Sequence, residues 1–543
     1  MPHIELDHVD SPRWSLITFG VLLLPVVIAI WCVPWFVTLD GPIHLYNAWI
    51  INQSLRGESS IKDLYAVQWT PLPNVAGHWL LAALLQVIPA WIADRLMMTL
   101  TSVGLAGAAL WLRWRVAGRQ GLLVLAPLAV ALGLNFMWLW GFYNFLLGAC
   151  LFSLTLGYWC AGRESRGISW AVVLAGLLVL GYLCHLVSSM ATVLGLVILA
   201  LTTPGPGWWA RCRWTAVILT PLVPLAVIYH GLMQGAGGLQ PVWRDLPTNS
   251  WSLRVWHQYL EASNPLNLLL DSRALPFVDW TSAWFRLLHP SSWGAVGLAL
   301  LVIGPLFKRT HQGELPARLY LGWTILTVVL CLGWVVGPSD FGVTHGRYLR
   351  ERLALLALLA LLSLLRADPK HLYGWIGGGA MAVMVAIQAA IVWDCALIAN
   401  RSIGLLMDAR PAIGTGKRIG TLRLTRPSRC MYDAASHADA LLGIETGNIV
   451  WNNYEATEYY FPVKYRDGHG RFLTDMFDRR VNLNARDAHE HLDHWARLFM
   501  EHHQIIDTFV VWGTHSGLDA MLTQWYGPEP VFHREDLRVF QHR

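Results

Sequence analysis

The chain has 543 residues, of which 55% are hydrophobic and only 14% are charged. An ordinary soluble protein has about 25% charged residues, so the composition excludes a typical soluble globular protein. The 30 tryptophans agree with a membrane location, because indole rings favour the lipid headgroup boundary. The net charge of +5 is spread over loops between apolar runs and gives no indication of nucleic-acid binding.

Long apolar runs fill the chain up to about residue 397. The first run, 16–36, is long enough to cross a bilayer and follows a polar tail, 1–15. No small-residue cleavage signal comes after it, so we expect a retained first span. A short run, 74–88, fits either a short span or a membrane-surface helix. The other runs lie at 92–112, 121–139, 142–161, 168–184, 186–203, 214–232, 291–307, 319–337, 348–365 and 372–395.

Loops rich in Lys and Arg indicate the orientation, because cytoplasmic loops carry an excess of basic residues. Such clusters stand at 113–119, 163–166, 211–213, 308–318 and 366–370. If these loops are cytoplasmic, the chain has about eleven spans, with about 13 as the upper bound. The N-terminus is then cytoplasmic, and the outer loops are 37–73, 233–290 and 338–347.

The region 397–543 has a different composition, with 35 of the 75 charged side chains and 10 of the 21 histidines. The segments "TGNIVWNNYEATEYYFPV" (446–463) and "IIDTFVVWG" (505–513) are typical of strands. A helical pattern, "ARDAHEHLDHWARLFMEHH" (485–503), lies between them. We therefore predict a polytopic α-helical membrane domain, 16–396, followed by an extracytoplasmic soluble α/β domain, 397–543.

The first outer loop begins with "VTLDGPIHLYNAWIINQSL" (37–55), in which Asp40 directly follows the first span. An ionisable residue at a membrane boundary is a functional candidate by default. A helix that starts near Pro42 places His44 about one turn beyond Asp40. Asp40 fits the N-cap of that helix, with Pro42 in its first turn, and it also fits a catalytic carboxylate. The two roles are compatible.

Further polar residues lie at the same predicted face of the membrane. Asn74 and His78 are one helical turn apart, and Asn144 and His185 stand in two other outer turns. Each of these residues alone is more often a satisfied polar group in a turn than a ligand. Their common location makes them candidates for binding a substrate.

A basic cluster stands in "GPSDFGVTHGRYLRERLALLALLALL" (337–362), at the outer end of a very apolar run. His345, Arg347 and Arg350 belong to it, although an outer location runs against the usual bias of basic residues. Arginine binds phosphate bidentately, so a lipid-linked phosphate is a natural partner. The alternative is that the long side chains simply reach the headgroups.

At Asp40 and the following "DGPIHLYNA" the chain resembles the polytopic membrane glycosyltransferases of the C-type fold (GT-C), which include protein mannosyltransferases and aminoarabinose transferases. In that family an acidic residue begins the first outer loop, and a Pro-containing segment leads into the next apolar run, as "TPLPNVAGHWLLAALL" (70–85) does here. This version of the motif resembles that of a set of uncharacterised bacterial membrane proteins. The resemblance covers residues 14–396.

The resemblance implies an inverting transferase that moves a hexosyl or pentosyl group from a polyprenyl-phosphate donor to a glycan, lipid or protein acceptor of the cell envelope. Asp40 is then the catalytic base at the outer face of the inner membrane. The residues expected to bind the sugar or lipid phosphate are His44, Asn74, His78, Asn144, His185, His345, Arg347 and Arg350.

Many members of the family carry a second acidic residue, whereas Gly41 and Pro42 follow Asp40 here. We therefore assign no metal ligand and no cofactor from the sequence, and a divalent metal stays open. Two other functions also stay open. The loop 233–290 fits an O-antigen polymerase or ligase, and many spans also occur in a transporter or a non-catalytic envelope assembly protein.

Overall fold

The computed structural model of the protein describes residues 12–162, 167–203, 207–247, 255–256, 259–260, 262–266, 290–303, 317–342, 346–365, 367, 371–424, 432–466, 470 and 500–542. The chain divides into two compact units. Unit 1 comprises Met1–Ala29, Pro71–Gly77 and Met97–Trp393. Unit 2 comprises Ile30–Thr70, His78–Leu96 and Asp394–Arg543. Residues 37–70 of the first outer loop thus belong to the same unit as the C-terminal region.

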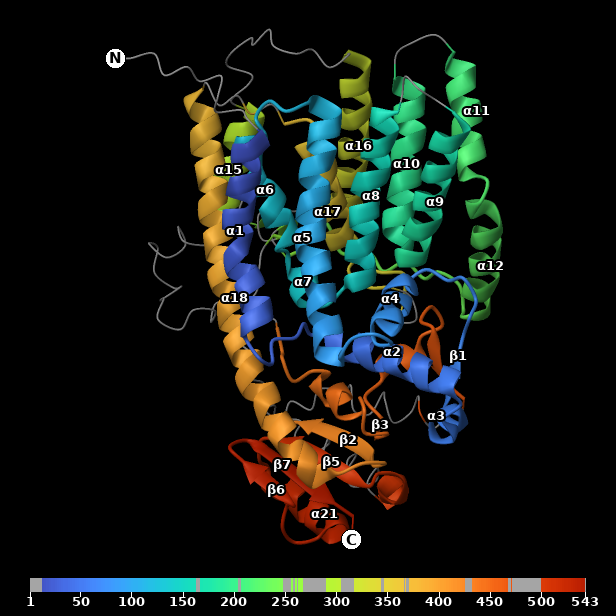
Figure 1. Ribbon diagram of the computed structural model, residues 1–543, viewed down its shortest axis with the longest axis vertical. Helices are drawn as coiled ribbons and strands as arrows, with labels where there is room; N and C mark the ends of the chain where they lie inside the picture. The colour runs from blue at the N-terminus through green and yellow to red at the C-terminus, as the bar shows by residue number, and fades with distance from the viewer. Residues whose placement is uncertain are drawn as a thin grey trace. The chain divides into compact units, whose positions relative to one another are not determined.

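Unit 1 is built from apolar helices, and Figure 1 shows α8, α9 and α10 side by side. A helix that is apolar on all faces is stable in a membrane or a large core, which fits the composition of these segments. Helices α16 and α17 pack on each other, and α10 packs on α16. The helices wholly or largely in this unit are α1 (Pro12–Cys32), α5 (Ala90–Ala117), α6 (Leu122–Gly133), α7 (Phe136–Leu139), α8 (Tyr143–Ala161), α9 (Ile168–Cys184), α10 (Leu186–Thr202), α11 (Trp208–Leu219), α12 (Leu222–Gly235), α15 (Pro290–Ile303), α16 (Ala317–Val336) and α17 (Leu349–Leu362).

Five helices among the described residues are long and apolar enough to cross a membrane. They are Arg13–Cys32, Ala90–Ala117, Leu122–Leu139, Tyr143–Ala161 and Leu372–Ile413. Helices α11 and α12, which meet at a bend of 50°, make a sixth if they form one broken span. The remaining apolar helices are shorter, so the count of eleven spans and the orientation of the chain stay predictions.

Two apolar runs differ from the expected extent. The run 74–88 contains α4 (Ala76–Leu84), whose nine residues are too few to cross a bilayer. The last run, expected to end at residue 395, is part of α18 (Leu372–Ile413), which continues into unit 2. The helix is therefore longer than the apolar run, because the polar residues after 397 do not interrupt it.

Unit 2 contains the helices of the first loop and all the named strands. After Asp40 come α2 (Gly41–Arg56), α3 (Ser59–Leu64) and β1 (Tyr65–Val67). β1 pairs antiparallel with β4 (Val463–Tyr465), about 400 residues later in the chain. A strand of the first loop and a strand of the C-terminal region therefore form one small sheet.

The second sheet of unit 2 has five strands in the order β3-β2-β5-β7-β6. β2 (Arg418–Arg423) pairs in parallel with β3 (Ile449–Val450) and with β5 (Thr508–Trp512). β7 (Leu537–Gln541) pairs antiparallel with β5 and with β6 (Phe532–Arg534). All five residues of β5 are buried, and α21 (Ser516–Tyr526) packs its apolar face in the same core. The strand expected within 505–513 is confirmed.

The strand expected over 446–463 is wrong in extent. Strand structure there is limited to Ile449–Val450 and to Val463, the first residue of β4. Between them a 3-10 helix, η4 (Tyr454–Thr457), follows a run of two asparagines. Asn452 and Asn453 are buried and bonded to other side chains, so they break the strand pattern. The helix expected at 485–503 lies largely outside the described residues.

Candidate functional site

Asp40 stands at the N-cap position of α2 without capping it. The Thr38 hydroxyl accepts the hydrogen bond from the Gly41 N–H instead, at 3.1 Å. The backbone carbonyl of Asp40 accepts the first helical bond, from the His44 N–H at 3.1 Å. The side chain of Asp40 is nevertheless buried, with 7% of the residue exposed. Its carboxylate is therefore available for contacts other than the helix end.

Two contacts of the Asp40 carboxylate come from the C-terminal region of the chain. Asp40 Oδ1 lies 3.5 Å from His437 Nε2, and the Tyr454 hydroxyl donates a hydrogen bond to the carboxylate. The rings of His437 and Tyr454 are 5.0 Å apart. Burial, together with the negative charges of Asp40 and Glu455, raises the pKa of Tyr454 well above its usual value. Tyr454 therefore keeps its proton and donates a hydrogen bond to Asp40.

One turn into α2, His44 takes part in a buried cluster with His78 and Glu455. His44 Nδ1 lies 2.7 Å from Glu455 Oε1, and His78 Nε2 lies 2.8 Å from Glu455 Oε2. The two ring nitrogens are 3.2 Å apart. His78 and Glu455 are fully buried, and His44 is 6% exposed. Two imidazoles and a carboxylate thus converge on one point, and these atoms are of the kind that hold a metal ion.

Asn47 lies one turn beyond His44 on the same face of α2 and fixes this cluster. Its Nδ2 donates to Glu455 Oε2 at 2.6 Å. Burial opposes the charge of Glu455, but the two imidazoles outweigh burial and hold the pKa of Glu455 well below its usual value. The carboxylate is therefore ionised in the folded protein at neutral pH.

The rest of the "DGPIHLYNA" motif docks the helix on the C-terminal region. The Tyr46 hydroxyl donates to the Asn448 carbonyl at 3.2 Å and accepts from the Val450 N–H at 3.3 Å. Gly443 lies against the Tyr46 ring, where a Cβ atom would come within 2.3 Å of a ring carbon. Glycine is required at 443, because the ring has no room to move in a buried site.

Asn74 and Asn144, also expected at the site, lie in unit 1 and contact each other. Asn144 Nδ2 donates to the Asn74 carbonyl at 3.0 Å, and Asn144 Oδ1 accepts from the Gly77 N–H at 2.7 Å. His185 caps α10, because its Nδ1 accepts from the Val187 N–H. These three residues therefore have structural partners, as expected of polar groups in turns.

The two predicted arginines differ in environment. Arg347 is exposed, whereas Arg350 is 1% exposed. Arg350 Nε donates to the Trp334 carbonyl at 2.8 Å, and its guanidinium lies 4.3 Å from the centre of the Tyr259 ring. The Arg350 Nη2 atom is buried without a hydrogen-bond partner. His345 lies outside the described residues.

Arg244 is a second cation at the Tyr259 ring, with its guanidinium 5.0 Å from the ring centre. Both guanidinium groups contact one ring, and like charges repel each other in a low-dielectric setting. An anion bound near Arg244 and Arg350 would offset that repulsion and could accept from the free Nη2.

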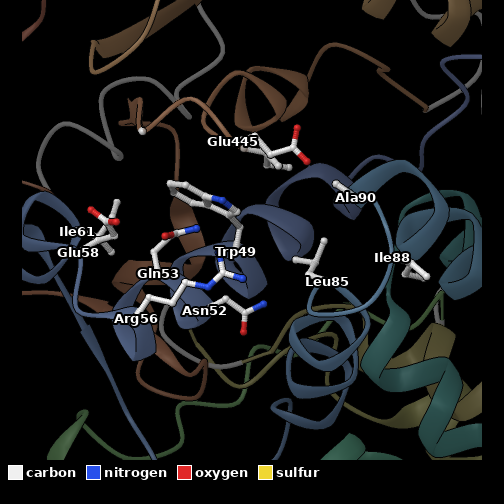
Figure 2. Close-up of a pocket in the computed structure, with 12 residues that line it drawn as sticks. Trp49, Asn52, Gln53, Arg56, Glu58, Ile61, Leu85, Ile88, Ala90 and Glu445 are labelled. Carbon is white, nitrogen blue, oxygen red and sulfur yellow. The ribbon is translucent and has the colours of Figure 1, made fainter.

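A polar pocket of about 420 Å³ opens along another face of α2, within unit 2. Figure 2 shows Trp49 and Arg56 pointing into it, with Glu445 across from them. Asn52, Gln53 and Glu58 add further polar groups to its wall. Its volume and lining suit a polar group of the size of a sugar.

Sequence reasoning did not identify Glu455, Tyr454 or His437 as site residues. Each lies about 400 positions after Asp40, in a region taken as a separate domain. One signal was present: the polar "NNYE" (452–455) interrupts an otherwise strand-like pattern.

No protein-family model matches the chain, and no curated protein sequence matches it. Among solved structures, the chain is similar to the crystal structure of ArnT from Cupriavidus metallidurans bound to undecaprenyl phosphate, with 12% identity, a TM-score of 0.51 and 98% of each chain covered. The apo structure of ArnT is also similar, with 13% identity, a TM-score of 0.46 and 97% of each chain covered. The undecaprenyl phosphate-bound structure shows that the chain has the GT-C fold, as predicted from its sequence.

Proposed function

We propose that the protein is a glycosyltransferase that moves a sugar from a polyprenyl-phosphate donor to an envelope acceptor at the outer face of the inner membrane, with Asp40 as base. The observation that carries this proposal is the Asp40 carboxylate, which is buried directly after the first span and does not cap its helix. The ArnT structure of the same fold contains undecaprenyl phosphate, which supports a lipid-linked donor.

The contacts of Asp40 suit a base that accepts a proton from an acceptor hydroxyl. General bases work best when a second group orients them and when water is largely excluded. The Tyr454 hydroxyl and the His437 ring hold the carboxylate from the side of the C-terminal region. In this proposal the ionised Asp40 takes the proton while the acceptor oxygen attacks the anomeric carbon, and the lipid phosphate leaves with the bonding electrons.

The leaving phosphate needs a cation as its negative charge develops. Arg350 suits this role better than Arg347, because it is buried, oriented by the Trp334 carbonyl and has a free Nη2 atom. Arg244 supplies a second positive charge at the same aromatic ring. A phosphate bound there would be held by charge-assisted hydrogen bonds.

The test is sugar transfer by the purified full-length protein in proteoliposomes that contain a radiolabelled polyprenyl-phosphate sugar and a membrane extract as acceptor source. We expect wild-type protein to release free polyprenyl phosphate and label the acceptor, and Asp40→Asn to reduce the rate at least about 100-fold. Asp63→Asn, an exposed aspartate on α3 of the same unit, is the matched control and should keep the rate.

Equal rates for Asp40→Asn and wild type, with normal membrane insertion, would remove Asp40 from catalysis. Movement of the intact lipid-linked sugar between leaflets without release of polyprenyl phosphate would instead favour a transporter and overturn the enzymatic proposal.

A further inference from the structure

The buried cluster of His44, His78 and Glu455 presents three ligand atoms that all lie within 4.8 Å of one another. We infer that these three residues bind a divalent transition-metal ion, with Zn²⁺ as the preferred ion. The inference does not rest on the proposed function, because it concerns binding of the ion alone.

The two oxygens of Glu455 differ in their contacts. Oε2 accepts a hydrogen bond from Asn47 Nδ2 and lies 2.8 Å from His78 Nε2. Oε1 is buried and lies 2.7 Å from His44 Nδ1. A cation at the point where the three side chains converge would give Oε1 a second partner.

The spacing of the ring nitrogens also fits a shared ion. Two histidine nitrogens bound tetrahedrally to one Zn²⁺ at 2.0–2.1 Å lie about 3.3 Å apart. His44 Nδ1 and His78 Nε2 are separated by 3.2 Å. Their ring planes are at 82°, so the two imidazoles approach that point from different directions.

The surrounding groups orient the ligands as the outer shell of a metal site does. Asn47 Nδ2 donates to Glu455 Oε2 at 2.6 Å, which fixes the carboxylate. Asn453 in turn holds Asn47 through a bond of 2.7 Å. The ligand set is therefore held before an ion arrives.

The donor atoms determine which ion fits. Two imidazoles and one carboxylate suit Zn²⁺, Co²⁺ or Ni²⁺, whereas Mg²⁺ and Ca²⁺ prefer oxygen ligands alone. Three protein ligands leave the fourth position of a tetrahedral ion to water or to a substrate oxygen. The backbone bond from His44 N to the Asp40 carbonyl ties this site to the start of α2.

The experiment uses the full-length protein in detergent, purified with a tag that contains no histidine and stripped with a chelator. We expect elemental analysis after addition of ZnCl₂ and gel filtration to find about one Zn²⁺ per chain. CoCl₂ should give the intense visible absorption of tetrahedral Co²⁺. Glu455→Gln should weaken Co²⁺ binding by about 100-fold or more, since even outer-shell changes cost 10–100-fold. Glu58→Gln, the same change at an exposed position of unit 2, should bind Co²⁺ like wild type.

Asn47→Ala is the second variant and should weaken Co²⁺ binding about 10-fold through loss of the bond to Glu455. The inference is overturned if wild-type protein retains no stoichiometric Zn²⁺ and gives no tetrahedral Co²⁺ spectrum. It is also overturned if folded Glu455→Gln binds Co²⁺ as tightly as wild type. If Glu455→Gln fails to fold, the wild-type spectrum and the Asn47→Ala affinity decide the question.

Discussion

The side-chain amides of Asn47 and Asn453 form a reciprocal pair of hydrogen bonds. Asn47 Nδ2 donates to Asn453 Oδ1 at 3.2 Å, and Asn453 Nδ2 donates to Asn47 Oδ1 at 2.7 Å. Both residues are completely buried. The pair joins the first-loop helix to the segment that supplies Tyr454 and Glu455, so the candidate site depends on it.

Asn47→Ala should therefore destabilise the protein. The change leaves the Asn453 amide and Glu455 Oε2 without one of their buried partners, and each such loss costs about 1–3 kcal/mol. We expect the thermal midpoint in detergent to fall by several degrees. Gln53→Ala, on the pocket-lining face of the same helix, should change the midpoint much less. Equal shifts for the two variants would contradict the importance of the amide pair.

Tyr454→Phe should lower kcat of sugar transfer about 10-fold with little change in the KM for the acceptor. The hydroxyl orients the Asp40 carboxylate through a hydrogen bond and does not need to touch the substrate. Steady-state kinetics in proteoliposomes measure the effect, with Tyr459→Phe as the matched control on the same segment. An unchanged kcat would show that Asp40 needs no orientation by Tyr454.

Arg350→Ala should raise the KM for the lipid-linked donor about 10–100-fold, because a charge-assisted hydrogen bond contributes about 1.5–3 kcal/mol. Arg347→Ala should raise it less than about threefold, since an exposed ion pair contributes at most about 1 kcal/mol. Donor titrations with both variants measure the difference. The reverse order of effects would move the phosphate site toward the exposed arginine.

Lys464 gives a prediction about pH. Burial lowers the pKa of Lys464 to about 7, although Glu458 and Glu455 act in the opposite direction. Below pH 7 the folded protein must keep the charged ammonium of Lys464 buried. The full loss of stability from this burial is present in that pH range. Between pH 7 and the unfolded pKa of about 10.4 the unfolded chain binds more protons, so stability rises with pH.

Lys464→Met removes the charge and should raise the thermal midpoint at pH 6 by more than it does at pH 10. At pH 6 the buried charge of Lys464 lowers the free energy of unfolding by a few kcal/mol as an order of magnitude. Thermal unfolding in detergent at the two pH values measures it. Lys62→Met, at an exposed position of α3, should leave the midpoint nearly unchanged at both values. A gain that is the same at pH 6 and pH 10 would contradict the titration of Lys464.

Local patterns in the sequence predicted the helices well. Each expected apolar run contains a helix. A long apolar run can be recognised from neighbouring residues alone, so its prediction needs no information about distant parts of the chain. The start of α2 was predicted from Asp40 and Pro42, which mark a helix beginning through local backbone geometry. The sequence could not show that Thr38 caps the helix and leaves Asp40 for other contacts.

The candidate site was only half predictable, because it joins segments far apart in the chain. Asp40, His44 and His78 were proposed from the first loop, and unit 2 contains all three. Glu455 was missed because the local hydrophobic periodicity of a sequence does not indicate contacts between distant residues. Glu455 and His78 are 377 positions apart. Which of Arg347 and Arg350 is the better candidate for binding the phosphate also depends on burial. The sequence does not show which of these two basic residues, three positions apart, is buried.

The pairing of β1 with β4 has a consequence for the synthesis of the protein. Residues 65–67 emerge from the ribosome long before their partners at 463–465. At a synthesis rate of about 5–20 residues per second, the delay is roughly 20–80 s. During that time the first loop has an unpaired strand and no Glu455 for its histidines. Nascent chains stopped before residue 440 should therefore leave this loop sensitive to added protease, whereas the completed chain should protect it.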